Sequence, residues 1–307
     1  MMELENKDGD NNYANRFGTC GRISALAWLQ AAGIPTFRLR RQLRMCNGMF
    51  NLANQLFYSD YAKMEYDGEL CNPLHPSHAY GMAFEKYLTG RNPSLKPSPA
   101  GSLLPVFFHM PNTKVHSVGT SKLNRMQVKG ALELLSDFVK CCPDVCPKDF
   151  VVISAHKPNV EYGNKILKHL PLLADMPPLQ SADSFQGREG PISVIITGTK
   201  EGVSAGFVSD ENRLNVMLTR QKSGLLIVGD KNVTGKLEGK PKEVSQADSQ
   251  AAKGKVYYEK NGEQVFSKVK ALRAMLKELN KWGRIFEIYT KKEKEKEKEQ
   301  EKEKEKG

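Results

Sequence analysis

The stretch that most constrains this fold is residues 179–230, where apolar runs too short for helices alternate with polar segments. Residues 192–199 and 224–230 read as buried strands, and the charged stretch between them, which begins near Asp210, reads as a helix. Two short apolar runs joined by one helix indicate parallel strands with their crossover. The polar turns and the helix then lie where such a sheet displays ligand-contacting groups.

The basic charge of the chain lies in its body and not in its tail. The 307 residues, enough for one large or two small domains, carry a formal net charge of +11. Residues 291–307 hold eight Lys and seven Glu and contribute +1, which leaves +10 for the rest. A basic body is compatible with phosphate-rich partners and predicts salt-sensitive binding. The tail itself could form a solvated single helix or be disordered.

Targeting and cysteine patterns indicate a soluble, reduced protein. No apolar run approaches the length needed to span a bilayer, and the first residues are polar and acidic. We therefore expect a cytoplasmic or nuclear protein with no membrane partner. The six cysteines show no framework spacing, which favours free thiols. We expect no metal site, because no second matching pair accompanies the two short Cys/His groups, Cys141–Cys142–Cys146 and Cys71–His75–His78.

The whole chain divides into five parts by composition and periodicity. We expect a flexible N-terminus (1–15), an α/β domain (16–230), a linker (231–253), a hairpin with an amphipathic helix (254–290), and the low-complexity tail (291–307). Residues 60–101 show no strong period and are expected to be an irregular connection. The other elements expected within the α/β domain are helices at 22–32, 49–57, 123–141 and 160–170, and strands at 37–45, 103–110 and 150–154.

Three segments resemble motifs of superfamily 1 helicases of the nonsense-decay type. Residues 183–189 (Asp-Ser-Phe-Gln-Gly-Arg-Glu) and 213–220 (Arg-Leu-Asn-Val-Met-Leu-Thr-Arg) resemble motifs V and VI of that family. Residues 42–45 resemble its Gln-Tyr-Arg-Met motif, with Leu43 in place of the Tyr that lies near the nucleotide base. The resemblance covers roughly residues 15–230. It implies a second, C-terminal RecA-like domain, a parallel sheet flanked by helices and related to P-loop NTPases.

The resemblance also implies roles for individual residues. Arg44 and Arg220 would be the catalytic arginines that contact the γ-phosphate of ATP, for which the planar guanidinium fork is suited. Glu189 would contact the ribose. In a parallel sheet we expect both arginines to share one cleft at the carboxyl ends of the strands, with Glu189 on its rim. The implied cofactor-binding residues are Gln42, Gly187, Glu189 and Arg213, and those of the nucleic-acid path are Ser154, His156, Ser181 and Asp183.

The sequence contains no phosphate-cradling Gly-x-x-x-x-Gly-Lys-Ser/Thr motif. Asp210 and Glu211 stand at a helix start, where acids serve as caps, and not at the end of an apolar strand. In the related helicases the phosphate loop and the Mg²⁺ ligands belong to the first RecA-like domain. The resemblance thus implies an ATP site shared with such a domain, on the same polypeptide or in trans. It also implies that Mg²⁺ is bound only through that domain and that no hydrolysis occurs without it.

Three functions remain open from the sequence, and with them the question of whether the chain is an enzyme. The first is a domain of an ATP-dependent helicase that acts on single-stranded RNA or DNA. The second is a degenerate helicase domain that binds nucleic acid or protein without catalysis. The third is a structural scaffold that uses the C-terminal helix and tail.

The charge distribution yields a first prediction. Binding of a fluorescent single-stranded oligonucleotide, followed by anisotropy, should weaken by about tenfold or more between roughly 50 and 200 mM salt, because basic side chains displace counterions from phosphates. Deletion of residues 291–307, which contribute only +1, should change the affinity little. Binding that disappears with the tail would contradict a site in the basic body.

Overall fold

The computed structural model describes residues 24–37, 39–59, 64–119, 121–237, 255–260 and 263–287. It divides into two units, one up to Arg40 and one from Arg41 onward. The described part of the first unit contains the helix α2 (Ala25–Ala31), which begins after the N-cap Ser24. The predicted α/β domain therefore starts in a unit separate from its sheet.

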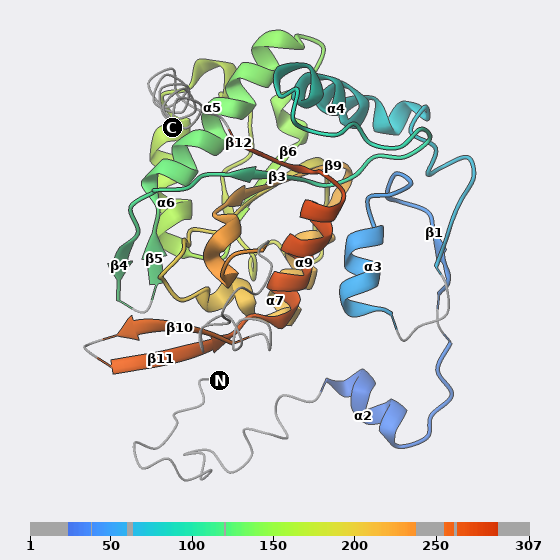
Figure 1. Cartoon of the computed structure of the whole chain (residues 1–307). Coiled ribbons are helices and arrows are strands. Elements are labelled where there is room, and N and C mark those ends of the chain that lie inside the picture. The colour runs from blue at the N-terminus through green and yellow to red at the C-terminus, as the bar shows by residue number, and fades with distance from the viewer. Residues whose placement is uncertain are drawn as a thin grey trace, which may run out of the picture. The chain divides into compact units, whose positions relative to one another are not determined.

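Six parallel strands form the central sheet of the second unit (Figure 1). From one edge to the other they are β12 (Ile285–Glu287), β3 (Val106–His109), β9 (Gln221–Gly229), β8 (Gly190–Ile196), β6 (Phe150–Ser154) and β7 (Gln180–Ser181). The helix α7 (Glu211–Leu218) connects β8 to β9, and these two strands pair in parallel. The predicted parallel sheet with its crossover is confirmed.

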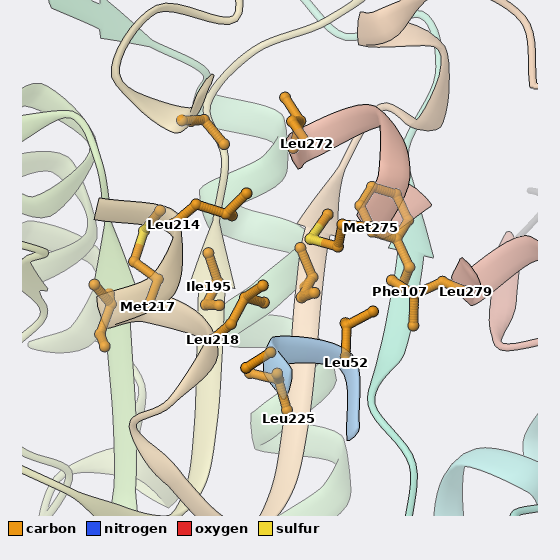
Figure 2. Close-up of a cluster of buried hydrophobic side chains, with 14 of the residues drawn as sticks. Leu52, Phe107, Ile195, Leu214, Met217, Leu218, Leu225, Leu272, Met275 and Leu279 are labelled. Atoms are coloured by element: carbon orange, nitrogen blue, oxygen red, sulfur yellow. The ribbon is translucent and has the colours of Figure 1, made fainter. Parts of the chain in front are cut away.

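Helices cover both faces of the sheet (Figure 1). Side chains alternate along each strand, so Leu225 and Ile227 of β9 point to one face and Leu226 to the other. Figure 2 shows the first of these faces, where Leu218 and Met275 from two helices pack with the strand residues. The helices on the first face are α3 (Asn51–Phe57), α7 and α9 (Lys270–Lys281), and those on the second are α4 (Ala79–Arg91), α5 (Arg125–Cys141) and α6 (Lys157–Leu167).

The shorter elements lie outside this sheet. Three two-stranded pairs are described: β1 (Arg41–Gln42) with β2 (Glu65–Tyr66) in parallel, and, both antiparallel, β4 (His116–Val118) with β5 (Ser121–Leu123) and β10 (Lys255–Lys260) with β11 (Glu263–Lys268). Short 3₁₀ turns are η1 (Pro76–His78), η2 (Pro147–Asp149), η3 (Pro171–Leu173), η4 (Gly206–Ser209) and η5 (Lys231–Thr234). Within the described ranges, no helix is both long and apolar enough to cross a bilayer.

The helix α4 corrects the expectation that residues 60–101 are irregular. Its buried face consists of Gly81, Phe84 and Leu88, at helical spacing. A Cβ atom at position 81 would lie 2.4 Å from the backbone oxygen of Ser223, so only glycine lets α4 approach β9 this closely. The segment shows no helical period in sequence, because apolar residues such as Met82 lie on the exposed side of the helix as well.

The C-terminal segment is part of the same core. Leu272, Met275 and Leu279 of α9 are buried against the first face of the sheet, and β12 pairs with β3. Residues 254–290 were expected to lie apart from the domain, since the resemblance ends near Asp230. A linker was expected from residue 231, whereas Val233 in η5 is buried. Residues 1–15, 238–254 and 291–307, where the flexible N-terminus, most of the linker and the tail were expected, lie outside the described residues.

A buried ion pair joins α4 to the start of β12. The Arg284 guanidinium donates to both carboxylate oxygens of Glu85, at 2.9 and 2.5 Å, and its side chain is fully buried. It also donates to three backbone carbonyl oxygens, those of Lys96, Leu104 and Pro105. Five hydrogen bonds from one side chain hold the edge strand against the helix layer.

We expect Arg284→Met to lower the free energy of unfolding by about 3–5 kcal/mol, because it leaves the Glu85 carboxylate buried without its partner. The control is Arg91→Met, which breaks the more exposed pair with Asp137 and should cost less than about 1 kcal/mol. Urea denaturation measures both. Equal losses would mean that the buried pair does not anchor the edge strand.

Candidate functional site

Three segments distant in sequence meet at the amino-terminal edge of β8 and β9. Arg44 lies two residues after β1, Glu189 directly precedes β8, and Arg220 directly precedes β9. The backbone N–H of Cys46 donates to the backbone oxygen of Lys222 at 2.7 Å, which joins the Arg44 turn to β9. These connections place the two expected catalytic arginines and the expected ribose contact at one edge of the sheet.

The Glu189 carboxylate bridges two cations. Its Oε2 lies 3.0 Å from Nη1 of Arg44, and its Oε1 lies 3.0 Å from Nζ of Lys222. Burial acts to raise the pKa of Glu189, but hydrogen bonding and charge attraction from Lys222 and Arg44 outweigh it and lower the pKa below its ordinary value. The carboxylate is therefore ionised at neutral pH and serves both cations.

The guanidinium groups of Arg44 and Arg220 meet at Thr219. Arg44 Nη2 donates to the Thr219 backbone oxygen at 2.7 Å, and Arg220 Nη2 donates to the Thr219 hydroxyl at 3.0 Å. Arg220 is further fixed by Nε, which donates to the backbone oxygen of Val216 at 2.8 Å, and by Nη1, which donates to that of Arg188 at 3.2 Å. The sheet edge thus holds both forks in defined orientations.

The cluster has more positive charge than it neutralises internally. Arg44, Arg220 and Lys222 face one carboxylate, that of Glu189. Burial and then the charge of Arg44 lower the pKa of Arg220, which means that the two arginines repel each other. Arg44 Nε is buried and finds no hydrogen-bond partner among the described residues. An unused donor and excess positive charge suit a multiply charged oxyanion such as a phosphate chain.

Two other expected nucleotide residues shape the backbone around this cluster. The Gln42 Oε1 accepts hydrogen bonds from the backbone N–H groups of Arg44, at 3.1 Å, and Met45, at 3.3 Å, and so holds the turn that carries Arg44. Gly187 has φ +84°, and the space around it is open. Glycine adopts this left-handed conformation without strain, and it leaves the backbone before Glu189 accessible.

An open cavity of about 320 Å³ adjoins the cluster. Its polar wall includes Glu189, Arg188, Gln180 and Lys148, and Phe185 contributes an apolar surface. Arg188 Nη1 donates to the Gln180 Oε1 at 3.3 Å and holds part of this wall in place. The cavity offers room beside Glu189 for the uncharged part of a ligand whose anionic part lies at the arginines.

The position of the cluster corrects one expectation. The two arginines were expected at the carboxyl ends of the strands, whereas Glu189 and Arg220 precede β8 and β9 and lie at their amino ends. The reason is connectivity: Arg220 follows the last turn of α7, and the end of a crossover helix leads into the beginning of the next parallel strand. The motif arginine is thereby carried to the opposite edge.

Arg213 lies at the other end of α7 and does not join this cluster. Its Nε is 3.0 Å from Oδ1 of Asp183, and its guanidinium carbon lies 4.8 Å from the centre of the Phe207 ring. Asp183 follows the carboxyl end of β7. The structure therefore groups Arg213, expected near the nucleotide, with Asp183, which was expected on the nucleic-acid path.

Two residues expected to contact nucleic acid are buried. The Ser154 hydroxyl donates to the backbone oxygen of Ile196 at 3.0 Å, inside the sheet. The His156 Nδ1 lies 3.3 Å from the Ser121 hydroxyl, and burial together with the nearby Lys122 lowers the pKa of His156 to about 4. The expectation that Ser154 and His156 contact nucleic acid directly does not fit this burial, because both side chains lie inside the protein and out of reach of a ligand.

The other two residues expected on the nucleic-acid path lie in the turn after β7. The hydroxyl of Ser181 is 2.8 Å from that of Ser184, and Ser181 is half-buried. Asp183 is exposed, with Arg213 as its partner. Of the four residues expected on the nucleic-acid path, Ser181 and Asp183 in this turn are the two that a strand of nucleic acid can reach.

Sequence reasoning missed Lys222 and the backbone oxygen of Thr219. Lys222 is half-buried at the start of β9, whose other side chains are buried. A lysine at the start of a strand whose other residues are buried was the available signal, because a cation in such a place favours a nearby counterion. A backbone oxygen gives no such signal, since its partners depend on the fold.

Comparison with known proteins gives one family for most of the chain. The AAA domain family matches residues 22–232. A probable helicase of Dictyostelium discoideum is 35% identical over 126 residues, which make up 39% of this chain and 12% of that protein. Regulator of nonsense transcripts 1 of Caenorhabditis elegans is 30% identical over 207 residues, 66% of this chain and 18% of its own length. Its Drosophila melanogaster homologue is 28% identical over 218 residues, which make up 68% of this chain and 16% of that protein. The aligned part thus spans less than a fifth of each relative.

We predict that Glu189→Gln lowers stability at neutral pH by less than about 1 kcal/mol, a small loss because the pair is more than one-third exposed. The folded-state pKa of Glu189 is lowered, so its contribution is present above the ordinary value of 4.5 and disappears as the pH falls through the folded value. Urea titrations of wild type and variant should therefore converge in acid.

The matched control is the same substitution in a Lys222→Met background. There Glu189→Gln should cost less at neutral pH, because one of the two attractions on the carboxylate is already gone. A stability difference that persists unchanged into acid, or is equal in both backgrounds, would contradict a role for the ionised carboxylate.

Proposed function

Because this chain belongs to the AAA domain family and carries a helicase domain like those of the regulators of nonsense transcripts, we propose that it acts as the second RecA-like domain of an ATP-dependent helicase. In this role it supplies arginines to ATP bound at the surface of a first RecA-like domain. It also forms part of the path of single-stranded RNA or DNA. The family association suggests ATP use and nucleic-acid binding in general, and the finer assignment rests on the residues below.

One observation carries the proposal: Arg44 and Arg220 converge on Thr219 at a single sheet edge, although 175 positions separate Arg44 from Thr219 in the sequence. Two guanidiniums held together repel; burial first, and then the charge of Arg44, lower the pKa of Arg220. Glu189 offsets only part of this charge, so a further anion placed between the two guanidiniums would stabilise them. The transferred phosphoryl group of a nucleoside triphosphate is such an anion, and its charge develops on oxygens that arginine forks bind well.

Each residue of the cluster has a distinct task in this proposal. Arg220, fixed by three hydrogen bonds, presents a preoriented fork to the γ-phosphate. Arg44 shares its fork between Glu189 and the Thr219 oxygen, so phosphate oxygens can take over the position of the carboxylate. Glu189 neutralises part of the positive charge until then and is afterwards free to contact the ribose beside the cavity. Gln42 and Gly187 hold the backbone that carries Arg44 and Glu189.

The remaining parts of the phosphoryl-transfer machinery come from a partner domain. A phosphate loop would neutralise the β- and γ-phosphates, and a bound Mg²⁺ would supply further positive charge to them. The sequence here has no such loop, so we assign both parts to a first RecA-like domain, on the same polypeptide or in trans. The arginine edge is the surface that closes over the nucleotide, and we place the protein in the cytoplasm or nucleus.

We expect no ATP turnover by this chain alone and restored turnover when a phosphate-loop domain of a superfamily 1 helicase is fused to it or added in trans. Phosphate release, measured with and without single-stranded RNA, tests both. In the restored enzyme Arg220→Ala and Arg44→Ala should each lower the rate by roughly a thousandfold or more, the range for arginines that stabilise the transferred phosphoryl group. Arg220→Lys should rescue poorly, because a lysine lacks the bidentate fork.

Arg91→Ala serves as the control and should leave the rate unchanged. Arg91 lies in α4, on the face of the sheet that does not contribute to the arginine cluster. If the isolated chain hydrolyses ATP and Arg220→Ala abolishes that activity, the assignment of the phosphate loop to a partner is wrong. Restored turnover that is insensitive to both arginines would remove them from the reaction. Nucleic-acid binding without any restored turnover would instead support a non-catalytic binding module.

A further inference from the structure

Three planar side chains contact one another at the end of α7 opposite the arginine cluster. The rings of His156 and Phe207 lie with centroids 5.8 Å apart at an angle of 56°, and the Arg213 guanidinium lies over the Phe207 ring at 4.8 Å. His156 is buried, Phe207 is 39% exposed, and the Arg213 side chain is 35% exposed. These contacts thus run from the interior to the surface and end at a guanidinium group.

The Arg213 plane is fixed on two sides. Asp183 accepts hydrogen bonds from its Nε, at 3.0 Å, and its Nη2, at 3.4 Å, so the carboxylate holds one edge of the guanidinium. Phe207 supports one face through a cation–π contact. A guanidinium held in this way loses little further freedom when a flat ligand covers its other face.

The charge pairing indicates what kind of group this surface binds. Asp183 compensates the charge of Arg213 and would repel a phosphate placed near the same edge. A planar, delocalised guanidinium still stacks well on a flat aromatic group, and nucleobases are stacked on arginine planes in single-strand recognition. The site therefore favours a base over a backbone phosphate.

We propose that Arg213, supported by Phe207 and oriented by Asp183, stacks on one base of a bound single strand. The proposal rests on the proposed function and adds a contact at the edge away from the arginine cluster. Phe207 and the buried His156 act as its rigid backing. Because every base has a flat face, the contact is tolerant of sequence.

The test uses the full chain and two single-stranded deoxyoligonucleotides of equal length, oligothymidylate and the same backbone without bases. Wild type should bind oligothymidylate more tightly. Arg213→Lys, which retains the charge opposite Asp183 but not the plane, should weaken binding of oligothymidylate by about tenfold, within the range for loss of one base stack. It should weaken binding of the abasic strand less than about twofold, because no stack is lost there.

Phe207→Leu provides a second variant, since it keeps apolar volume but removes the aromatic support. Like Arg213→Lys, it should weaken binding of oligothymidylate more than binding of the abasic strand. Arg91→Lys, on the exposed pair with Asp137, should leave both affinities unchanged. Thermal unfolding of each variant shows that the fold is retained.

Equal loss of affinity for both strands, or no loss, would overturn the stacking site while leaving the proposed function in place. A purely structural Arg213–Asp183 pair would lower the unfolding temperature without changing the preference for bases. Failure of the wild type to bind either strand would overturn the nucleic-acid part of the proposed function and this site with it.

Discussion

Gly190 pairs with Gln221 where β8 and β9 begin, and this register sets Glu189 and Arg220 beside each other as the residues directly before the two strands. After a one-residue irregularity, the parallel pairing resumes at Ile192 with Gly224 and runs to Ile196 with Val228, with apolar side chains on both faces. A slip of one residue would exchange the side chains that face the two helix layers, and each layer is packed against the other set, so packing opposes such a slip. The core thereby fixes the geometry of the charged edge.

The helix α7 separates two kinds of polar site. Arg220 follows its last turn and meets Arg44 at the amino ends of the strands, whereas Arg213 lies in its first turn and meets Asp183 beyond the end of β7. The two sites differ in their charge balance. The first has three cations for one carboxylate, and the second has one cation for one carboxylate. An anion suits the first site and a flat, uncharged group suits the second.

Local patterns predicted the parts of the fold that consist of side chains at regular spacing. The strands around 150–154 and 192–199 and the helices near 123–141 and 211–218 occur close to where their apolar periods placed them. The helix α4 was not predicted, because apolar residues such as Met82 lie outside its buried face and blur the helical period, and its close contact with β9 depends on Gly81. The strand β12 was not predicted either, since three residues show no period and gain their stability from pairing with β3.

The sequence by itself determined the parallel α/β sheet, the crossover helix, and the residue types that a phosphate site needs, because hydrophobic period and motif order are local properties. Only the tertiary structure decided which charges meet. Lys222 became a partner of Glu189, Arg213 was drawn to Asp183, and Ser154 and His156 were buried behind the edge. Contacts between residues far apart in sequence depend on strand order and register. No single segment contains that information, so the edge on which each charge lies emerges only when the sheet is assembled.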